Sequence, residues 1–562
     1  MKCGKNEYWN SKRSRVQKIL LILTGVIIGA VIVGFTGSDP DYFFKINKSI
    51  DIFGVVYREV TANYVEEVDP EKFMEAGIDG MLGTLDPYTN FIAEREADEV
   101  QLITSGTYGG IGVTIGLRDG FITILGLMDG YSAQRQGVQP GDRVIEVDGK
   151  AVQGMNPQDI RSLTRGEPGT EVRLRIERVD ELQSLEFILV REKIQLKNIT
   201  YADYISNGIA YIRLERFTMS AGDELRLALK ELKLRGTMKG IILDLRGNPG
   251  GLLEAAVDIV EKFVAKGNLV VSTKGRSPES EKKYFVVEDP LVPEIPLVVL
   301  INGQSASASE VAAGAIQDLD RGLIVGTRSF GKGLVQTVLP LVYNTQLKIT
   351  TANYYTPSGR CIQEIDYRNR TAKGVFATTP DSLKRKFKTL KGRLELEAGG
   401  IEPDSMVQEP ERSALYQELL RRSMFFRFAS SYSSLYPDTP KVFNETALIA
   451  EFRKYLDSLK FTYRDEVEVK LGELYDIAEK CKYSDEVKNY VTELKSKILT
   501  EKNIALDRYS GELLTALKPE IMSRYKGQKG NIEEALKDDV QVKTALNLLM
   551  DAKEYNQRLD PN

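Results

Sequence analysis

The clearest structural signal in this chain is the run Leu297-Val-Val-Leu-Ile-Asn-Gly-Gln-Ser-Ala-Ser-Ala-Ser-Glu310. Its first five residues are apolar, as in a buried strand, and the run Val311–Asp318 that follows predicts a helix. A serine between the two would stand at a helix N-terminus, where free N–H groups and the helix dipole favour a developing oxyanion. Ser307 and Glu310 also fit a capping box, so a structural role is the alternative to a catalytic one.

Strands and helices alternate on both sides of this run. Apolar stretches predict strands at Ile209–Leu214 and Gly240–Leu245, and amphipathic stretches predict helices at Ala221–Leu234 and Leu252–Val264. The alternation, which extends over residues 196–404, predicts a layered α/β domain.

The remaining segments have different patterns. Residues 42–95 show near-helical spacing of apolar side chains, and residues 96–190 contain short glycine-punctuated strands such as Ile111–Ile115. Residues 405–562 are rich in Glu, Lys and Leu and predict helices to the end of the chain. With 562 residues, the chain is long enough to form several such domains.

The charge and the residue counts exclude several classes of function. The chain has 76 Lys and Arg against 80 Asp and Glu, so no global positive field exists to hold nucleic acid. It has no histidine, which excludes a Ser-His-Asp triad, a Cys-His dyad and metal sites built on imidazole. The three cysteines lack metal-ligand spacing, so no metal site is predicted.

A membrane-spanning helix is predicted at Ile19–Ser38, which is a run of 20 uncharged and mostly apolar residues. The preceding tail, residues 1–18, holds six basic residues and one acidic residue, so the positive-inside rule places this tail in the cytoplasm. Everything after residue 38 is then expected outside the cytoplasmic membrane, in the periplasm or the extracellular space. A cleaved signal peptide is the competing interpretation, but no clear Ala-x-Ala site lies near Gly34–Asp41.

Two further motifs could carry chemistry. Asp244-Leu-Arg-Gly-Asn-Pro-Gly-Gly251 is a glycine-rich turn between a strand and a helix, where backbone N–H groups can face an oxyanion. Gly326-Thr-Arg-Ser-Phe-Gly-Lys-Gly333 nearly matches the phosphate-binding pattern GxxxxGK[ST]. However, Gly333 replaces the hydroxyl residue of that pattern, and the next residues resemble a strand instead of a helix. Nucleotide binding is therefore disfavoured.

Lys332 is the candidate base for a serine nucleophile in a chain without histidine. Burial would have to lower its pKa from about 10.4 toward neutrality. Gln336 lies four residues further on and shares a face with Lys332 if this segment is a regular strand, so it could orient the amine. An ordinary exposed strand residue is the alternative interpretation of Gln336.

These pieces, in this order, resemble the carboxyl-terminal processing (tail-specific) protease family, which are serine peptidases with a Ser-Lys dyad. The likeness runs from about Phe53 to Asp404. It includes the motifs Gly80–Tyr88, Gly110–Val113, Gln139–Asp142, Val147–Gly149, Asp244–Gly251, Ser305–Glu310, Gly331–Gly333 with Gln336, and Thr356–Arg360.

The resemblance implies a crotonase-like α/β protease core at residues 196–404, with an inserted β-rich PDZ domain at residues 96–190. It makes Ser307 the nucleophile, Lys332 the general base and Gln336 its supporting residue. It places the oxyanion donors at two backbone N–H groups, those of Gly251 and Ala308. No metal or organic cofactor is implied.

The PDZ domain implied by the resemblance has its own physical logic. Such a domain adds a peptide as a strand to an open sheet edge and captures the terminal carboxylate with clustered backbone N–H groups. The candidate loop consists of Gly109, Gly110, Ile111 and Gly112.

The sequence thus predicts a multidomain α/β serine endopeptidase with an N-terminal transmembrane anchor and a helical C-terminal region. Its expected partners are proteins or peptides with free C-termini and the membrane, but no nucleic acid, and a homo-oligomer is compatible with the sequence. The alternative from another class is a catalytically silent PDZ scaffold or chaperone that binds protein tails.

Overall fold

The computed structural model describes residues 40–96, 102, 104–118, 120–178, 181, 183–370, 376–378 and 380–560. The chain divides into two compact units, Met1–Phe91 and Ile92–Asn562. The basic tail and the predicted membrane helix Ile19–Ser38 lie outside the described residues. Among the helices that the structure does describe, none is both long enough and apolar enough to cross a bilayer.

In the first unit, the described residues 40–91 form helices α2 (Pro40–Asn63) and α3 (Pro70–Leu82). Asp69 caps α3, because its carboxylate accepts hydrogen bonds from two backbone N–H groups in the first turn. The two helices meet where the rings of Tyr57 and Phe73 stack with their centroids 5.5 Å apart. The segment is therefore mostly helical, as its apolar spacing predicts. It is followed by the short elements β1 (Asn90–Ile92) and η1 (Glu94–Glu96).

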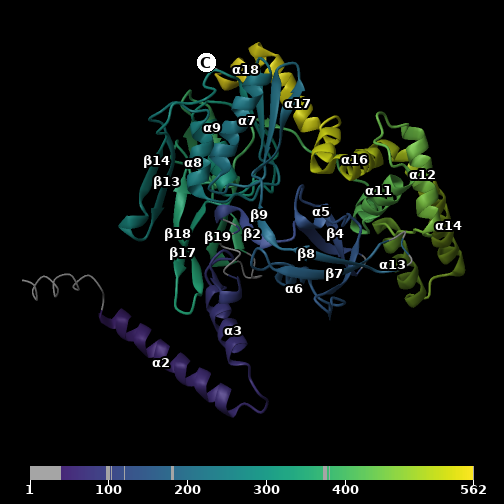
Figure 1. The fold of residues 1–562 in the computed structure, drawn as a ribbon, viewed down its shortest axis with the longest axis horizontal. Helices are drawn as coiled ribbons and strands as arrows, with labels where there is room; N and C mark the ends of the chain where they lie inside the picture. Colours follow the sequence, from purple (N-terminus) through teal and green to yellow (C-terminus); the bar gives the residue numbers. More distant parts are fainter. Residues whose placement is uncertain are drawn as a thin grey trace, which may run out of the picture. The chain divides into compact units, whose positions relative to one another are not determined.

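The second unit contains a six-stranded sheet, which lies beside the helix labelled α7 (Ala221–Arg235) in Figure 1. In spatial order its strands are β10 (Ile199–Ser206), β11 (Ile209–Leu214), β12 (Gly240–Asp244), β15 (Leu297–Ile301), β16 (Leu323–Gly326) and β23 (Ser405–Met406). β10 is antiparallel to β11, and all the other neighbours are parallel. Parallel strands end at the same edge of a sheet, so the loops that follow β12 and β15 lie side by side.

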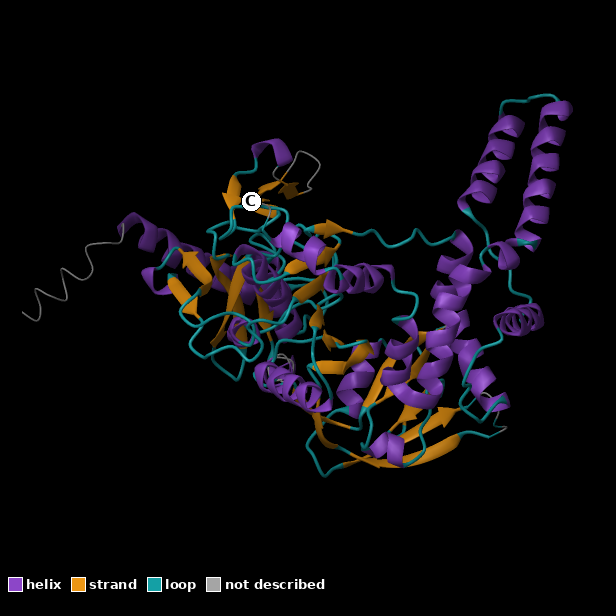
Figure 2. Cartoon of the chain, turned by 90° about the horizontal axis from the view of Figure 1, so that it is seen from above, coloured by secondary structure: helices purple, strands orange, loops and turns teal. Residues whose placement is uncertain are grey.

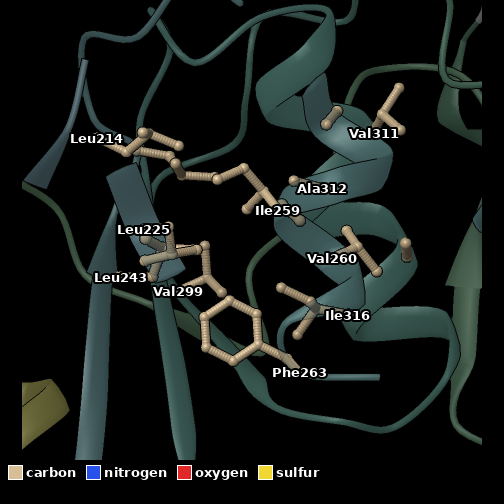
Figure 3. Close-up of a cluster of buried hydrophobic side chains, with 14 of the residues drawn as sticks. Leu214, Leu225, Leu243, Ile259, Val260, Phe263, Val299, Val311, Ala312 and Ile316 are labelled. Carbon is tan, nitrogen blue, oxygen red and sulfur yellow. The ribbon is translucent and has the colours of Figure 1, made fainter. Parts of the chain in front are cut away.

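Three helices cover one face of this sheet: α7 (Ala221–Arg235), α8 (Leu253–Glu261) and α9 (Ala308–Asp318). Figure 3 shows the cluster between the layers, in which Leu243 and Val299 come from the sheet and Ile259 and Ile316 from the helices. All of these side chains are fully buried. The strand–helix alternation in the sequence thus predicts this half of the core correctly.

The opposite face of the sheet is covered by two helices from the C-terminal region, α17 (Val540–Met550) and α18 (Ala552–Leu559). Val542 and Leu548 of α17 belong to the same buried cluster as Ile242 of the sheet. The last two helices of the C-terminal helical region are therefore part of the core around this sheet.

A second, antiparallel sheet contains β13 (Leu269–Gly275), β14 (Lys282–Phe285), β17 (Leu334–Pro340) and β18 (Gln346–Tyr355). β17 is a strand, which agrees with the rejection of a phosphate-binding loop before it. Short elements complete this region: η2 (Pro278–Ser280), β19 (Ile365–Arg370), β20 (Phe376–Thr378), η3 (Asp381–Leu383), β21 (Lys386–Lys388) and β22 (Leu394–Leu396).

The β-rich module forms a sheet in the order β3 (Val113–Arg118), β4 (Phe121–Leu127), β5 (Arg143–Val147), β7 (Glu171–Glu177), β8 (Leu185–Val190), with β6 (Lys150–Ala151) paired to β5. Its helices are α5 (Ser132–Arg135) and α6 (Pro157–Thr164). The predicted strand Ile111–Ile115 is wrong in its bounds. β2 (Thr107–Gly110) pairs with β9 (Glu192–Gln195), and β3 begins only at Val113, because Gly112 breaks the strand with a φ of +78°.

The C-terminal region, predicted as helical from residue 405, starts with the short strand β23 and is helical beyond it in the described residues (Figure 2). Its further helices are α10 (Ala414–Arg421), α11 (Met424–Leu435), α12 (Glu445–Ser458), α13 (Glu466–Lys480), α14 (Asp485–Asn503), α15 (Ala505–Arg508) and α16 (Ser510–Ala535, kinked at Gly527). α10, α11, α12 and α16 share a separate core that includes Phe425, Phe428 and Phe452.

Candidate active site

Ser307 is the residue at which the loop after β15 turns into α9. Its backbone has φ 56° and ψ −114°, a conformation that L-residues rarely adopt. Strained backbone of this kind persists only where the surrounding structure holds it, and it clusters at functional sites. The loop therefore presents Ser307 at a helix N-terminus, as the sequence predicts.

The carboxylate of Glu310 holds this loop, because it accepts four hydrogen bonds. The N–H of Ser307 lies 2.8 Å and the N–H of Lys332 2.9 Å from the same oxygen, Oε2. The hydroxyl of Ser329 and the N–H of Gly331 donate to Oε1 at 2.6 and 2.7 Å. A single fully buried side chain thus ties the backbones of Ser307 and Lys332 together.

Tyr354 of β18 makes a second bridge between the same two residues. Its hydroxyl lies 2.6 Å from the carbonyl oxygen of Lys332 and 3.1 Å from that of Ser307, and it can donate its proton to either. Burial, followed by the nearby Glu310 carboxylate, raises the pKa of Tyr354 well above its usual value, so the donor stays protonated. Ser307 and Lys332 are therefore joined through their N–H groups by Glu310 and through their carbonyls by Tyr354.

The titration of Glu310 reflects a balance between burial and these bonds. Burial raises its pKa to about 7, and the four donors act in the opposite direction, because they stabilise the anion. A protonated carboxyl group has one acceptor position fewer, so protonation would release one of the four bonds.

The glycine-rich turn Asp244–Gly251 packs directly against the Ser307 loop, as the parallel sheet requires. A methyl group on Gly250 would lie 2.9 Å from the N atom of Ala308 and 3.0 Å from Cβ of Ser307. Gly251 forms a β-bridge with Phe217, where a side chain would meet the Phe217 carbonyl oxygen at 2.3 Å. The structure therefore packs Gly250, the residue before the predicted oxyanion donor Gly251, against Ser307 and the other predicted donor, Ala308.

The two serines that flank Ser307 fasten its loop to this turn. Ser305 donates a hydrogen bond from its hydroxyl to the carbonyl of Leu245, at 2.8 Å. Ser309 donates to the carbonyl of Asn248, at 2.9 Å. Both side chains are fully buried, so the three serines of the motif have different surroundings, and Ser307 alone is partly exposed.

The turn is itself braced by Asp244 and Arg246. Burial favours the neutral acid, but the guanidinium of Arg246 outweighs it and holds the pKa of Asp244 below its usual value. Arg246 also binds the Asp539 carboxylate at 2.8 Å and the Gln541 amide oxygen at 2.9 Å. Both partners stand at the start of α17, so the C-terminal helices reach the glycine-rich turn.

The expected relation between Lys332 and Gln336 needs a correction. The expectation of a shared face assumed a regular strand, whereas β17 begins only at Leu334 and its register shifts between Val335 and Gln336. Such a bulge breaks the alternation of side chains. The amide of Gln336 donates to the hydroxyl of Thr350 at 3.2 Å, on the paired strand β18.

In the β-rich module, only part of the predicted carboxylate loop Gly109–Gly112 is a loop. Gly109 and Gly110 belong to β2 and pair with β9, so Ile111 and Gly112 alone connect β2 to the edge strand β3. The carbonyls of Ile111 and Gly112 accept hydrogen bonds from Ala133 and Met128. The N–H groups of Ile111 and Gly112 donate to no acceptor within the described part of the chain. Gly109 packs against Gly166, where a side chain would meet the Gly166 carbonyl oxygen at 2.0 Å.

Comparison with known proteins places this geometry in a family. Residues 208–369 match Peptidase family S41, residues 123–178 match the PDZ domain, residues 42–96 match the activating protease CtpB N-terminal domain, and residues 415–549 match the probable PDZ-protease C-terminal helical domain. Over 445 residues, the chain is 33% identical to a carboxy-terminal-processing protease of Bartonella bacilliformis, covering 76% of this chain and 100% of that protein. The chain belongs to the carboxy-terminal processing protease family.

Other relatives of this processing protease share less of its length. It is 30% identical over 365 residues to the carboxy-terminal processing protease CtpA of Bacillus subtilis, covering 63% of this chain and 76% of that protein. Among solved structures, the photosystem II D1 C-terminal processing protease is 27% identical, covers 63% of this chain and 86% of that chain, and superimposes with a TM-score of 0.34. The resemblance to carboxyl-terminal processing serine proteases with a PDZ domain is thus confirmed.

Reasoning from the sequence missed two structural contributors to this protease's site, Tyr354 and Asp539. Tyr354 lies 47 residues beyond Ser307 and reaches it only through the second sheet. Asp539 lies far beyond Asp404, where the resemblance to the family ends. Neither stands in a motif with a spacing that signals its role. Glu310 gave a signal, the capping box, but that pattern does not reveal that its carboxylate also binds the N–H of Lys332.

Proposed function

We propose that this processing protease cleaves peptide bonds with Ser307 as the nucleophile and Lys332 as the general base. The observation that supports this pairing most strongly is the Glu310 carboxylate, one oxygen of which accepts from the N–H groups of both residues. Two residues 25 positions apart are thereby held in one loop system, and the chain has no histidine to act instead.

In this mechanism, neutral Lys332 takes the proton of the Ser307 hydroxyl as its oxygen attacks the scissile carbonyl carbon. The negative charge on the carbonyl oxygen is stabilised by the N–H groups of Gly251 and Ala308, since both belong to backbone that packs around Ser307. Lys332 then returns its proton to the leaving amine, and an acyl-enzyme on Ser307 remains. Water activated by the same lysine hydrolyses it. Gln336 is proposed to support the amine of Lys332.

The PDZ domain is proposed to select the substrate by its C-terminus. The edge strand β3 can accept a peptide as an additional strand. Just before it, Ile111 and Gly112 of the predicted loop (Gly109, Gly110, Ile111 and Gly112) offer N–H groups to a terminal carboxylate. The substrates would then be proteins or peptides with free C-terminal carboxylates.

The protease is further proposed to be a single-pass protein of the cytoplasmic membrane, anchored by Ile19–Ser38, with its catalytic part outside. The support is the apolar run and the basic tail before it. After alkaline carbonate washing of cells, the full-length chain should stay with the membrane pellet. A mature N-terminus near residue 38 would show signal-peptide cleavage instead.

Substitution of the two central residues tests the mechanism. Ser307→Ala should lower kcat by at least about 10³-fold. Lys332→Arg should lower kcat to a similar extent, because a guanidinium stays protonated and cannot act as a base. Lys283→Arg on β14 is the control, since this exposed lysine lies outside the site. Cleavage of a quenched fluorescent peptide and labelling by a serine-reactive fluorophosphonate are the measurements.

Full activity of Lys332→Arg would contradict the dyad. Absence of both cleavage and labelling in the wild-type protein, with peptide binding retained, would support the silent scaffold or chaperone instead.

A further inference from the structure

A cavity of about 320 Å³ runs along the open edge of β3, beside α6. One part of its wall is apolar and consists of Leu102, Ile111, Val113, Ile115, Met128 and Leu196. The other part carries three guanidinium groups, those of Arg161, Arg165 and Arg216. No acidic side chain lines the cavity in the described residues. The combination of an apolar wall with three cations favours the binding of a ligand in this cavity.

The three arginines are weakly neutralised. Arg165 lies over the ring of Tyr108, 4.8 Å from its centroid, and forms no ion pair in the described chain. Arg161 likewise has no carboxylate within ion-pair distance there. Within the described residues, Arg216 pairs only with Glu215, at 3.8 Å, and that carboxylate also pairs with Arg213 at 3.2 Å. Cations that line a partly apolar cavity without carboxylate partners favour an anionic occupant.

The cations gather at one end of the groove. Arg161 lies in the last turn of α6 and Arg165 caps that helix. The residue after Arg165, Gly166, donates its N–H to the carbonyl of Gly109, at 3.3 Å. A peptide added antiparallel to β3 would place its C-terminus at this end, beside the loop before Val113.

One of these cations does not belong to the PDZ domain. Arg216 follows β11 of the protease core, and its neighbour Phe217 forms the β-bridge to Gly251. The groove is thus completed by the segment that also holds the catalytic turn. One of the three cations of the groove therefore comes from the protease core.

We propose that this groove selects tails that carry an acidic side chain within their last three residues, next to an apolar residue. The terminal carboxylate would bind the N–H groups of the Gly109–Gly112 loop, and the acidic side chain would bind Arg165 and Arg216. This inference rests on the proposed tail recognition and adds the chemistry of the tail to it.

The test is the binding of fluorescein-labelled hexapeptides to the full-length Ser307→Ala protein, so that cleavage does not interfere. Each peptide ends in a free carboxylate and places Glu at the last, second-last or third-last position, and its twin has Gln there. At one position or more, the Glu peptide should bind at least about 10-fold more tightly than its twin, because a charge-assisted hydrogen bond is lost in the twin. The ratio should shrink as ionic strength rises.

Two variants and one control locate the effect. Arg165→Gln and Arg216→Gln should each bring the Glu-to-Gln ratio toward 1 while leaving the affinity for the Gln twin within about 3-fold. Arg118→Gln, at the far end of β3 and outside the cavity wall, should leave the ratio unchanged.

Equal binding of all Glu and Gln twins would overturn the proposal. So would an equal loss of both twins in the arginine variants, which would mean that the arginines read only the terminal carboxylate. Cleavage of the same peptides by the wild-type protein is measured separately. Cleavage without a Glu preference would leave the protease mechanism intact and refute the preference for an acidic tail. A Glu preference in binding without any cleavage would support the acidic-tail preference and refute the protease mechanism.

Discussion

The loop around Ser307 and the PDZ groove use polar groups in opposite ways. At the loop, a fully buried carboxylate accepts four hydrogen bonds, and each flanking serine hydroxyl has a carbonyl partner. In the groove, three guanidinium groups line a cavity without an acidic side chain among the described residues. Catalysis benefits from groups that are already positioned, since no reorganisation is then needed in the transition state. Recognition benefits from groups whose strongest partner is the ligand.

The contrast predicts that steric disturbance of the loop has the largest effect on activity. Gly250→Ala should lower kcat by about 10³-fold, because its methyl group would push against Ala308 and Ser307 and its φ of +101° disfavours an L-residue. Gly247→Ala is the matched control: it has a positive φ in the same turn but its nearest neighbour is 3.7 Å away. Peptide cleavage and far-UV circular dichroism are the measurements. Equal losses in both variants would show that backbone strain, not packing at Ser307, decides activity.

Removal of the Glu310 charge should have the next largest effect. Glu310→Gln keeps the volume but turns an NH₂ group toward backbone or hydroxyl donors, so kcat should fall by about 10²-fold. KM and the affinity of the PDZ groove for peptides should change little. Glu254→Gln on α8 serves as the control, because this residue makes no ion pair in the described chain. Unchanged kcat in Glu310→Gln would contradict the role of the bridge.

The raised pKa of Glu310 predicts a stability change with pH. Its pKa of about 7 exceeds the usual 4.5, so between these values the folded protein holds a proton that the unfolded chain has released. Stability should therefore fall as pH rises through this window, by roughly 3 kcal/mol, and level off above pH 7. Melting temperatures of the wild type and Glu310→Gln from pH 5 to 8 test this. The wild type should lose several degrees relative to the variant. Parallel curves would mean that Glu310 titrates normally.

A smaller effect on kcat is expected where the C-terminal helices contact the glycine-rich turn Asp244–Gly251. Asp539→Asn removes the charge opposite Arg246 but keeps an oxygen to cap α17, so kcat should fall by about 3- to 10-fold with little loss of stability. Asp538→Asn changes a neighbouring carboxylate that pairs with Lys518 and Lys543, and it should leave kcat unchanged. Similar activities in the two variants would show that the helical region acts on the core only through its apolar packing.

The smallest expected effect is a higher affinity of the PDZ groove for an acidic tail. Glu215→Gln removes the carboxylate nearest to Arg216, so an acidic tail should bind about 2-fold more tightly, in keeping with the weak energy of a partly exposed ion pair. Fluorescence anisotropy with the Ser307→Ala protein measures it. Glu167→Gln, an exposed residue of the same module, is the control. A weaker affinity in Glu215→Gln would show that Glu215 positions Arg216 instead of competing for it.

Much of this arrangement could be predicted along the chain, because it depends on local patterns. The apolar run 297–301, the alternation around it and the glycine-rich turn after β12 predict a parallel sheet whose loops meet at one edge. Ser307 at the start of a helix follows from that. The position of Gln336 could not be predicted, since a bulge in β17 is invisible to a spacing argument. Nor could the strand break at Gly112, where a positive φ ends the extended conformation.

The sequence by itself determined the class of chemistry, since it contains no histidine and holds Ser307 and Lys332 in motifs typical of one protease family. It also determined the order of strands and helices, because periodicity is a local property. Only the tertiary structure decided which distant groups hold the site. Tyr354, Asp539 and Arg216 come from three separate regions, and their positions arise when sheets, helices and the PDZ module pack together. Contacts of this kind depend on distance in space, which spacing along the chain does not encode.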